Sequence, residues 1–302
     1  MEIKQLEIFA CVAKRLSFSK AAEELFVSQP TVSTQVNSLE KNLGVQLFTR
    51  NTKGVSLTKA GEECLLYAKK ILSLRDEVRW RVSGEDKNTS GEVDIISSTI
   101  PAQHLLPGII ADFQKTWKNV IFRVVQADSR RVISEMSGFR YDFGLVGTVP
   151  RDERFCCIPI FGDELVLAVP ADFPNDFTPS YDNFSKLIAK TPFIMRESGS
   201  GTRVEVEGLL SQIGINLKNL AVPAYFSDTH SILLAVSRNM GVSLVSKIAA
   251  AMYVDVGLVK TVEFHGEIFT RKIFLIYNKE LWLSPMQKAF ADEAKRKAVG
   301  EI

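Results

Sequence analysis

The chain has 302 residues, of which 46% are hydrophobic and 24% are charged, and its formal net charge is only +2 at pH 7. This composition predicts a globular protein of two or three compact units and argues against a disordered chain. The near-neutral charge excludes a general basic surface for nucleic acid, and no apolar run reaches the roughly 18 residues that a membrane span needs.

The chain opens with a predicted helix that has one apolar face. That face is formed by residues at helical spacing, namely Ile3, Leu6, Phe9 and Ala13. A second helix is predicted over residues 20–25, with Ser19 as its N-cap and with Phe26 and Val27 closing it. A third helix begins only three residues later, and two helices at this spacing predict a helix-turn-helix.

The third helix is predicted to present one face to the core and the other to DNA. Ser28 is placed to cap it, Pro30 lies in its first turn, and Gly44 supplies a left-handed stop. The face expected in the core carries Val32, Val36, Leu39 and Leu43. The candidate DNA contacts, in a major groove, are Ser28, Gln29, Pro30, Thr31, Ser33, Thr34, Gln35 and Ser38.

A basic turn is predicted between two short strands, residues 46–49 and 55–57. Its candidate contacts with backbone phosphate are Arg50, Asn51 and Lys53, followed by Gly54. The alternative is a solvated polar helix followed by an ordinary basic turn. We favour a DNA-binding wing because the capped helix pair, the glycine stop and the turn occur together and in this order.

These residues resemble the N-terminal domain of the LysR-type transcriptional regulators. The resemblance lies in Ser17-Phe18, Ala21-Ala22, Ser28 to Ser33, Leu39-Glu40, Leu43-Gly44, Leu47 to Arg50 and Leu57 to Gly61. The length and layout of the remaining chain also fit this family. The resemblance implies a dimer or tetramer that binds a double-stranded DNA operator, responds to a small effector, and has RNA polymerase as a further partner.

A long helix is predicted from Thr58 to about Ser83, because no proline or glycine follows Gly61. Apolar residues recur along it at the steps of a coiled-coil seam, namely Cys64, Tyr67, Ile71, Leu74 and Val78. The resemblance implies that this helix pairs with its counterpart in a second subunit. The alternative is that it packs on its own C-terminal domain. Residues 84–91 are polar and glycine-flanked, which predicts a flexible joint.

Beyond residue 91, strands and helices alternate in a pattern that predicts a parallel α/β architecture. We expect lobe 1 to hold about residues 91–163 and 267–302, and lobe 2 about residues 164–266, as in the family's periplasmic-binding-protein-like effector domain. The predicted fold class is α+β. It has a winged helix-turn-helix at 1–58, a linker helix and hinge at 59–90, and a two-lobed effector domain at 91–302.

Two lobes joined by two crossings form a hinged cleft, and ligands in such sheets bind beyond the strand ends, near helix N-termini. The segments there offer mainly hydroxyls and backbone N–H groups, which favours a small oxyanion or carboxylate. The candidate effector-binding residues are Ser98, Thr99, Thr148, Ser198, Gly199, Ser200, Thr202 and Arg203. Their hydroxyl pattern resembles family members that sense sulfur oxyanions, whereas others sense organic acids or sugar phosphates.

Several cleft residues have a structural alternative. Ser98 or Thr99 can simply cap the following helix, and Asp228 is expected to cap its own. Two arginines rank lower as ligand contacts because nearby carboxylates can neutralise them, namely Arg196 beside Glu197 and Arg203 beside Glu205.

The four cysteines and three histidines show neither a disulfide framework nor a metal-ligand spacing. Adjacent Cys156 and Cys157 are expected to pack in a strand, with a redox switch as the alternative. We expect no cofactor, no metal and no catalytic residue. The first residues lack the apolar core of a signal peptide, so a cytoplasmic location is expected. The rival interpretation is a cytoplasmic solute-binding or enzymatic α/β module without a regulatory role.

Overall fold

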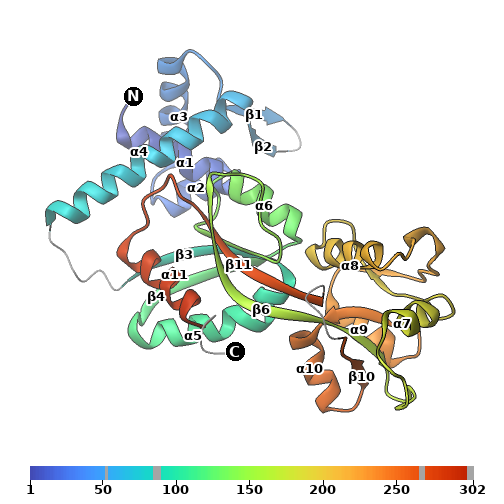
Figure 1. Ribbon diagram of the computed structural model, residues 1–302. Helices are drawn as coiled ribbons and strands as arrows, with labels where there is room; N and C mark the ends of the chain where they lie inside the picture. The colour runs from blue at the N-terminus through green and yellow to red at the C-terminus, as the bar shows by residue number, and fades with distance from the viewer. Residues whose placement is uncertain (52–53, 84–89, 265–268, 298–302) are drawn as a thin grey trace.

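The computed structural model describes residues 1–51, 54–83, 90–264 and 269–297 (Figure 1). Its N-terminal part is a helical bundle with a two-stranded hairpin beside it, followed by one long helix. The elements are α1 (Ile3–Arg15), α2 (Phe18–Glu24), α3 (Gln29–Leu43), β1 (Phe48–Asn51), β2 (Gly54–Leu57) and α4 (Lys59–Ser83). This order confirms the predicted winged helix-turn-helix and the long helix that follows it.

The caps of α3 are as predicted. The hydroxyl of Ser28 accepts a hydrogen bond from the N–H of Thr31 at 3.3 Å, and Gly44 ends the helix with φ 70°. The face predicted to lie in the core is buried at Val32, Val36 and Leu39. The prediction was wrong for Leu43, which is 41% exposed at the end of the helix, and for Ile3, which is exposed at the start of α1.

The predicted start of the second helix was wrong. Its N-cap is Ser17, whose hydroxyl accepts a hydrogen bond from the N–H of Lys20, so Ser19 lies within the helix. The earlier start places Phe18 in the core, where its ring meets that of Phe48. At the other end, Phe26 is 95% exposed in a left-handed conformation, because it occupies the tight turn between the two helices.

Glu40 joins the recognition helix α3 to the wing. Its side chain is buried, and its Oε1 accepts hydrogen bonds from the N–H groups of Leu47 at 2.7 Å and Phe48 at 3.2 Å. These donors precede and begin β1, where the strand leaves the helical core. One carboxylate therefore fixes the position of the wing relative to the helix expected to read DNA.

We expect Glu40→Ala to destabilise the winged helix-turn-helix by about 2 kcal/mol, because two buried N–H groups lose their acceptor. Glu40→Gln is the matched control, since its amide oxygen can still accept one of these bonds. The stability of both variants is measured by chemical unfolding followed by far-ultraviolet circular dichroism. Equal losses in the two variants would contradict the acceptor role of Glu40.

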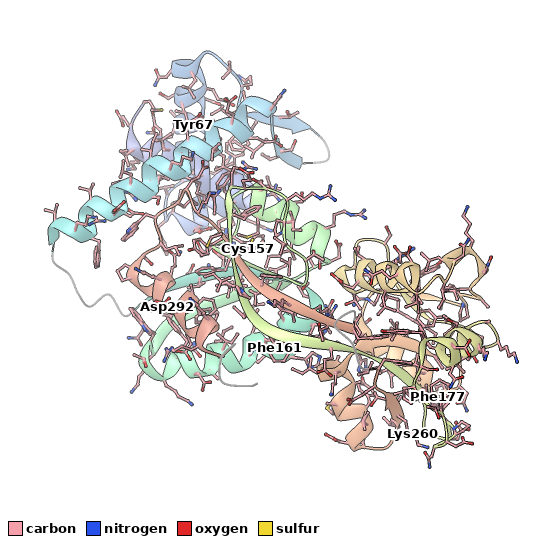
Figure 2. The ribbon with its side chains drawn as sticks, in the orientation of Figure 1. Tyr67, Cys157, Phe161, Phe177, Lys260 and Asp292 are labelled. Atoms are coloured by element: carbon pink, nitrogen blue, oxygen red, sulfur yellow. The ribbon has the colours of Figure 1, made fainter. Side chains whose placement is uncertain are left out.

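The residues of the predicted seam lie on two different sides of the linker helix α4. Cys64 and Ile71 pack against the core of the winged helix-turn-helix, whereas Tyr67 (labelled in Figure 2), Leu74 and Val78 are exposed. The exposed residues form an apolar stripe along the outer side of the helix. Such a stripe is suited to a partner helix, so pairing with a second subunit stays a prediction that this geometry favours.

The same helix also packs on its own C-terminal domain, which was the alternative to pairing. The backbone N–H of Trp282 donates a hydrogen bond to Ser73 Oγ at 2.6 Å, and the ring centres of Trp80 and Trp282 lie 6.1 Å apart. Lys70 pairs with Glu280 at 2.9 Å. The two predicted arrangements are therefore compatible, because they use different sides of α4. The joint predicted at 84–91 lies mostly outside the described residues.

The C-terminal part consists of two lobes joined by two strands (Figure 1). Its described strands are β3 (Ser90–Ser97), β4 (Asn119–Gln126), β5 (Phe143–Val146), β6 (Phe155–Pro170), β7 (Met195–Arg196), β8 (Tyr225–Phe226), β9 (Ser243–Ser246), β10 (Val259–Val262) and β11 (Thr270–Asn278). Its described helices are η1 (Pro101–Leu105), α5 (Leu106–Thr116), α6 (Ser129–Ser137), α7 (Tyr181–Ile188), α8 (Gly201–Gln212), η2 (Leu217–Asn219), α9 (Thr229–Ser237), α10 (Lys247–Asp255) and α11 (Pro285–Lys297).

The main sheet is mixed, which corrects the prediction of a parallel sheet. Among the described residues its strand order is β10-β6-β11-β5-β3-β4, with β9 also on β6. β3 pairs in parallel with β4 and β5, whereas β11 pairs antiparallel with β5 and β6. β11 is antiparallel to both neighbours because it returns from the other lobe, whereas β5 and β6 run toward it.

Strands β6 and β11 carry the chain across the cleft. β6 pairs with β11 up to Glu164 and continues to Pro170, where it pairs with β9 and β10 of the other lobe. The closing helix α11 packs its Phe290 into the core beneath β3 and β5. The exact lobe limits stay a prediction, and residue 267 lies outside the described part. No helix in the described ranges has the length and apolar character to cross a membrane.

Candidate DNA-binding surface and effector cleft

The predicted DNA-binding residues of the helix-turn-helix gather at the start and on one side of α3. Four of them are exposed, namely Ser28, Gln29, Pro30 and Thr34, and four are half-buried, namely Thr31, Ser33, Gln35 and Ser38. Gln29 Nε2 donates to Ser33 Oγ at 3.3 Å, so two adjacent turns of the helix present linked polar groups. Ser38 Oγ accepts a hydrogen bond from Gln5 Nε2 at 3.1 Å, which ties its hydroxyl to α1.

The wing is narrower than predicted. Arg50 and Asn51 belong to β1 and Gly54 begins β2, with Asn51 paired to Gly54 in the antiparallel register. Lys53 lies outside the described residues. The predicted turn was too wide because the polar residues at the strand ends resemble turn residues in sequence.

In the effector domain, two helix N-termini meet across the cleft. Asp128 caps α6 in lobe 1 and Ser200 caps α8 in lobe 2. A Cβ on Gly201 would lie 2.7 Å from Ser129 Oγ, and one on Gly199, which has φ +110°, would lie 2.9 Å from Asp128 Oδ1. Glycines at these two positions therefore allow the lobes to approach this closely.

A buried ion pair spans the base of the cleft. Arg271 on β11 donates to Asp163 Oδ2 on β6 from Nε at 2.8 Å and from Nη2 at 2.6 Å. The two side chains are 5% and 1% exposed. Ser246 donates to the other carboxylate oxygen, and Arg271 Nη1 donates to Thr202 Oγ1 at 2.9 Å. This network links both crossing strands to the start of α8.

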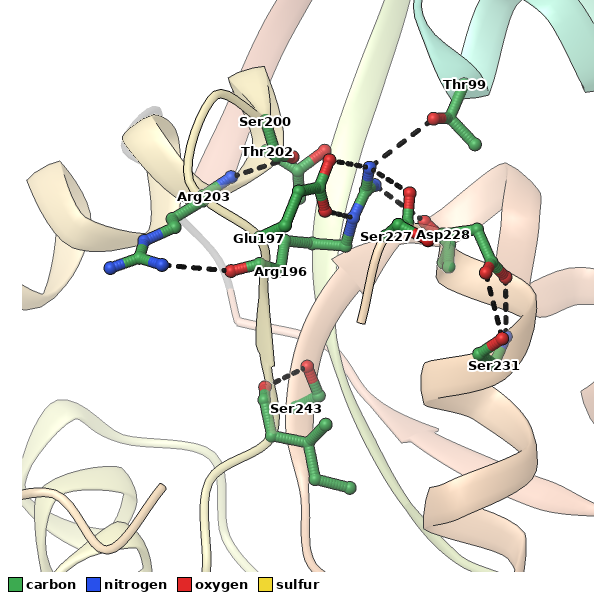
Figure 3. Close-up of polar contacts among 12 residues, drawn as sticks. Thr99, Arg196, Glu197, Ser200, Thr202, Arg203, Ser227, Asp228, Ser231 and Ser243 are labelled. Atoms are coloured by element: carbon green, nitrogen blue, oxygen red, sulfur yellow. Dashed lines mark hydrogen bonds and ion pairs between the residues drawn. The ribbon is translucent and has the colours of Figure 1, made fainter. Parts of the chain in front are cut away.

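A second buried arginine bridges the two lobes, as Figure 3 shows. Arg196 Nη2 donates to Thr99 Oγ1 of lobe 1 at 3.4 Å, and it also donates to the Ser227 carbonyl at 3.0 Å. Its guanidinium forms a two-point pair with Glu197, at 2.8 Å from Nε and 3.0 Å from Nη2. The prediction that Glu197 neutralises Arg196 is thus confirmed.

Arg203 is placed differently from the other cleft candidates. Its guanidinium donates to the backbone carbonyl of Arg196 at 3.3 Å, as Figure 3 shows, rather than joining the contacts of the Arg196 side chain. It pairs with Glu207 at 2.7 Å and lies 4.9 Å from the ring centre of Tyr225. The predicted partner Glu205 was wrong, because on a helix the residue four positions ahead lies on the same face. Asp228 caps α9, as expected.

The cleft contains a small inner cavity and a larger outer one. The inner cavity, of about 20 Å³, is lined by Ser98, Thr99, Ser129, Arg196, Ser200 and Thr202, among others. The outer cavity, of about 870 Å³, includes Thr148, Phe161, Glu205, Lys272 and Phe274. Gly147 and Arg271 line both. Ser198 and Gly199 line neither. Figure 2 shows Phe161 on β6 where that strand passes between the lobes.

The cysteines and histidines form no evident reactive centre in the described part of the chain. No group of three or more histidine, cysteine or acidic side chains there could hold a metal ion. Cys156 and Cys157 lie on β6 opposite Tyr277 and Ile276 and form no disulfide. Burial raises the pKa of the Cys157 thiol, and a hydrogen bond with Cys156 raises the pKa of Tyr277 to about 12. A redox role for the pair stays a hypothesis.

Comparison with known proteins matches both parts of the chain to family models. Residues 3–62 match the bacterial regulatory helix-turn-helix protein, lysR family, and residues 86–299 match the LysR substrate binding domain. An uncharacterised HTH-type transcriptional regulator of Methanocaldococcus jannaschii is 34% identical over 280 residues, which cover 92% of this chain and 93% of that protein.

Two further proteins show the same layout along their whole length. A RuBisCO operon transcriptional regulator of Allochromatium vinosum is 30% identical over 296 residues, covering 97% of this chain and 95% of that protein. The solved structure of a full-length OxyR variant from Pseudomonas aeruginosa is 21% identical, covers 98% of both chains and has a TM-score of 0.80. The fold is therefore shared from end to end.

Proposed function

Since the chain belongs to the LysR family of bacterial transcriptional regulators and has its helix-turn-helix and effector-binding domains, we propose that it reads a specific operator through α3. The main support is the polar start of α3, where a capped recognition helix presents Ser28, Gln29 and Ser33 at the surface. Because the net charge is close to zero, we expect DNA affinity to come from base contacts and from several subunits binding together, rather than from a general basic surface.

We expect Ser33→Ala to weaken binding to the selected operator by about 1–3 kcal/mol while leaving binding to random DNA nearly unchanged, because a base contact carries sequence information. Lys53→Ala is the contrasting variant and should weaken all sequences about equally. Affinities are measured at one fixed salt concentration, on sites selected from a random library by the protein itself. If Ser33→Ala weakened binding to both DNAs equally, Ser33 would not be a base contact.

For the effector, we propose a small anion in the interlobe cleft, either a small carboxylate or a sulfur oxyanion. The support is the set of buried hydroxyls and guanidiniums from both lobes, namely Thr99, Ser200, Thr202, Arg196 and Arg271. The large outer cavity, with Phe161 and Phe274 in its wall, favours a carboxylate on an organic body over a bare oxyanion. Cleft closure around it would change how the paired linker helices present α3.

Thermal unfolding of the full chain tests this assignment, because a ligand that binds only the folded state raises the melting temperature. The screen contains sulfate, sulfite, phosphate and small organic carboxylates. We expect a concentration-dependent rise with an organic carboxylate and its loss in Thr202→Ala, because Thr202 lines the inner cavity and accepts a hydrogen bond from Arg271 there. A rise that survives in Thr202→Ala would place the bound anion elsewhere.

The remaining partners follow from the family. We propose a homo-oligomer that pairs through the exposed stripe of α4, with RNA polymerase as a partner of the DNA-bound form. Because the proposed target is a DNA operator, we propose a cytoplasmic location. The rival solute-binding or enzymatic module without regulation would have no use for the capped recognition helix and the wing fixed to it by Glu40. We therefore propose no catalytic role.

A further inference from the structure

The cations in the inner cavity are already neutralised. Arg196 pairs with Glu197, and Arg271 pairs with Asp163. Among the described residues that line the inner cavity, no guanidinium therefore lacks a carboxylate partner. An anion that binds here has to displace one of these two carboxylates, since a third negative charge beside two complete pairs would be unfavourable in a site shielded from water.

Asp163 is not suited to leave. Its side chain is 1% exposed, it accepts two hydrogen bonds from Arg271 and one from Ser246, and it lies on the continuous strand β6. The buried carboxylate has no open path to water along which it could move. Its displacement would also leave Arg271 buried without a counter-charge. Breaking a buried pair in this way is strongly unfavourable.

Glu197 differs from Asp163 in each of these respects. Its side chain is 27% exposed, and within the described residues its carboxylate oxygens both accept hydrogen bonds from Arg196. It follows β7 in the loop that leads to α8, where a rotation of the side chain can bring the carboxylate into water. Its release therefore requires no rearrangement of a strand.

Arg196 stays in position when Glu197 leaves. Its side chain is 5% exposed, and its guanidinium also donates to Thr229 at 3.3 Å, to the Ser227 carbonyl and to Thr99 across the cleft. Its Nε and Nη2 edge now holds the Glu197 carboxylate at two points, which is the geometry that a ligand carboxylate adopts on arginine. Figure 3 shows this edge facing the carboxylate.

We propose that Glu197 is an internal competitor of the effector. Its carboxylate occupies the anion position on Arg196 in the free protein, and the carboxylate or oxyanion of the effector displaces it. The inference rests on the proposed function of the cleft as an anion site. The inner cavity beside Arg196 has a volume of about 20 Å³, which is room for little more than one water molecule, so an anion on this arginine needs the position that the Glu197 carboxylate holds.

Competition predicts that Glu197→Gln binds anions more tightly than the unmodified chain, because a neutral amide holds Arg196 less strongly. The probes are phosphate, sulfate and malonate, titrated calorimetrically into the full-length protein at constant ionic strength. We expect the dissociation constant of the best probe to fall about tenfold to 100-fold. The gain should disappear when Arg196→Gln is added to Glu197→Gln, with thermal unfolding as the check that both variants fold.

Glu205→Gln is the matched control. Glu205 lines the outer cavity and carries the same charge, and its substitution leaves the Arg196 pair intact. An equal gain in this control would overturn the proposal, since it would show a general effect of negative charge. An unchanged or weaker affinity in Glu197→Gln would overturn it too. If no probe binds to the unmodified chain or to either variant, the proposed anion site is wrong, and the proposed competition by Glu197 is wrong with it.

Discussion

Asp163→Ala is expected to lower the free energy of unfolding of the effector domain by about 3–5 kcal/mol. The substitution leaves the guanidinium of Arg271, which is 5% exposed, without its carboxylate. It also removes the hydrogen-bond acceptor of the Ser246 hydroxyl. Arg271 is then no longer held in the position from which it donates to Thr202 at the start of α8.

Two comparison variants separate the unpaired charge from lost packing. Asp163→Leu combined with Arg271→Met should recover most of the lost stability, because an apolar pair removes both buried charges together. Asp152→Ala removes the carboxylate of the more exposed Asp152–Arg154 pair and should cost less than about 1 kcal/mol. Urea unfolding of the full chain, followed by circular dichroism, provides the measurement. A loss for Asp163→Ala no larger than for Asp152→Ala would contradict a structural role of the buried pair.

Local features of the fold could be predicted from the sequence because their causes are local. The cap at Ser28 and the stop at Gly44 act within one helical turn, and the apolar spacing of α3 places Val32, Val36 and Leu39 in the core. The same local logic failed at Ser19, because Ser17 also precedes the helix and only the burial of Phe18 decides between them.

The polar network of the cleft depends on residues that are distant in sequence. Arg271 and Asp163 are 108 positions apart, and Arg196 and Thr99 are 97 positions apart. The sequence predicted the hydroxyls near helix N-termini, since strand ends and caps have local signals. It missed Arg271 and Asp163, because charged residues on two strands reveal a buried pair only when the strand register is known. It ranked Arg196 below the hydroxyls because of Glu197, and the structure places Arg196 in the wall of the inner cavity despite that pairing.

Gly61→Ala is expected to destabilise the junction between the wing and the linker helix by about 3 kcal/mol. A Cβ at this position would lie 2.0 Å from the carbonyl oxygen of Leu47 and 2.9 Å from Leu57 Cδ2. That same oxygen accepts a hydrogen bond from the N–H of Thr58 at 2.9 Å, so the helix cannot move away without losing it. This close contact explains why the segment from Leu57 to Gly61 ends in glycine.

The control for Gly61→Ala is Gly208→Ala in α8, where a Cβ would meet no atom within 4 Å. Alanine is the better helix former, so this control should stabilise its helix by about 0.5–1 kcal/mol. Amide hydrogen exchange, read on peptides from β1 to the first turns of α4 and on peptides of α8, reports both local stabilities in one chain. Slower exchange around α4 in Gly61→Ala would show that the close approach to Leu47 does not limit this position. Faster exchange there, with slower exchange around α8 in the control, would establish that backbone contact, rather than helix propensity, requires glycine at residue 61.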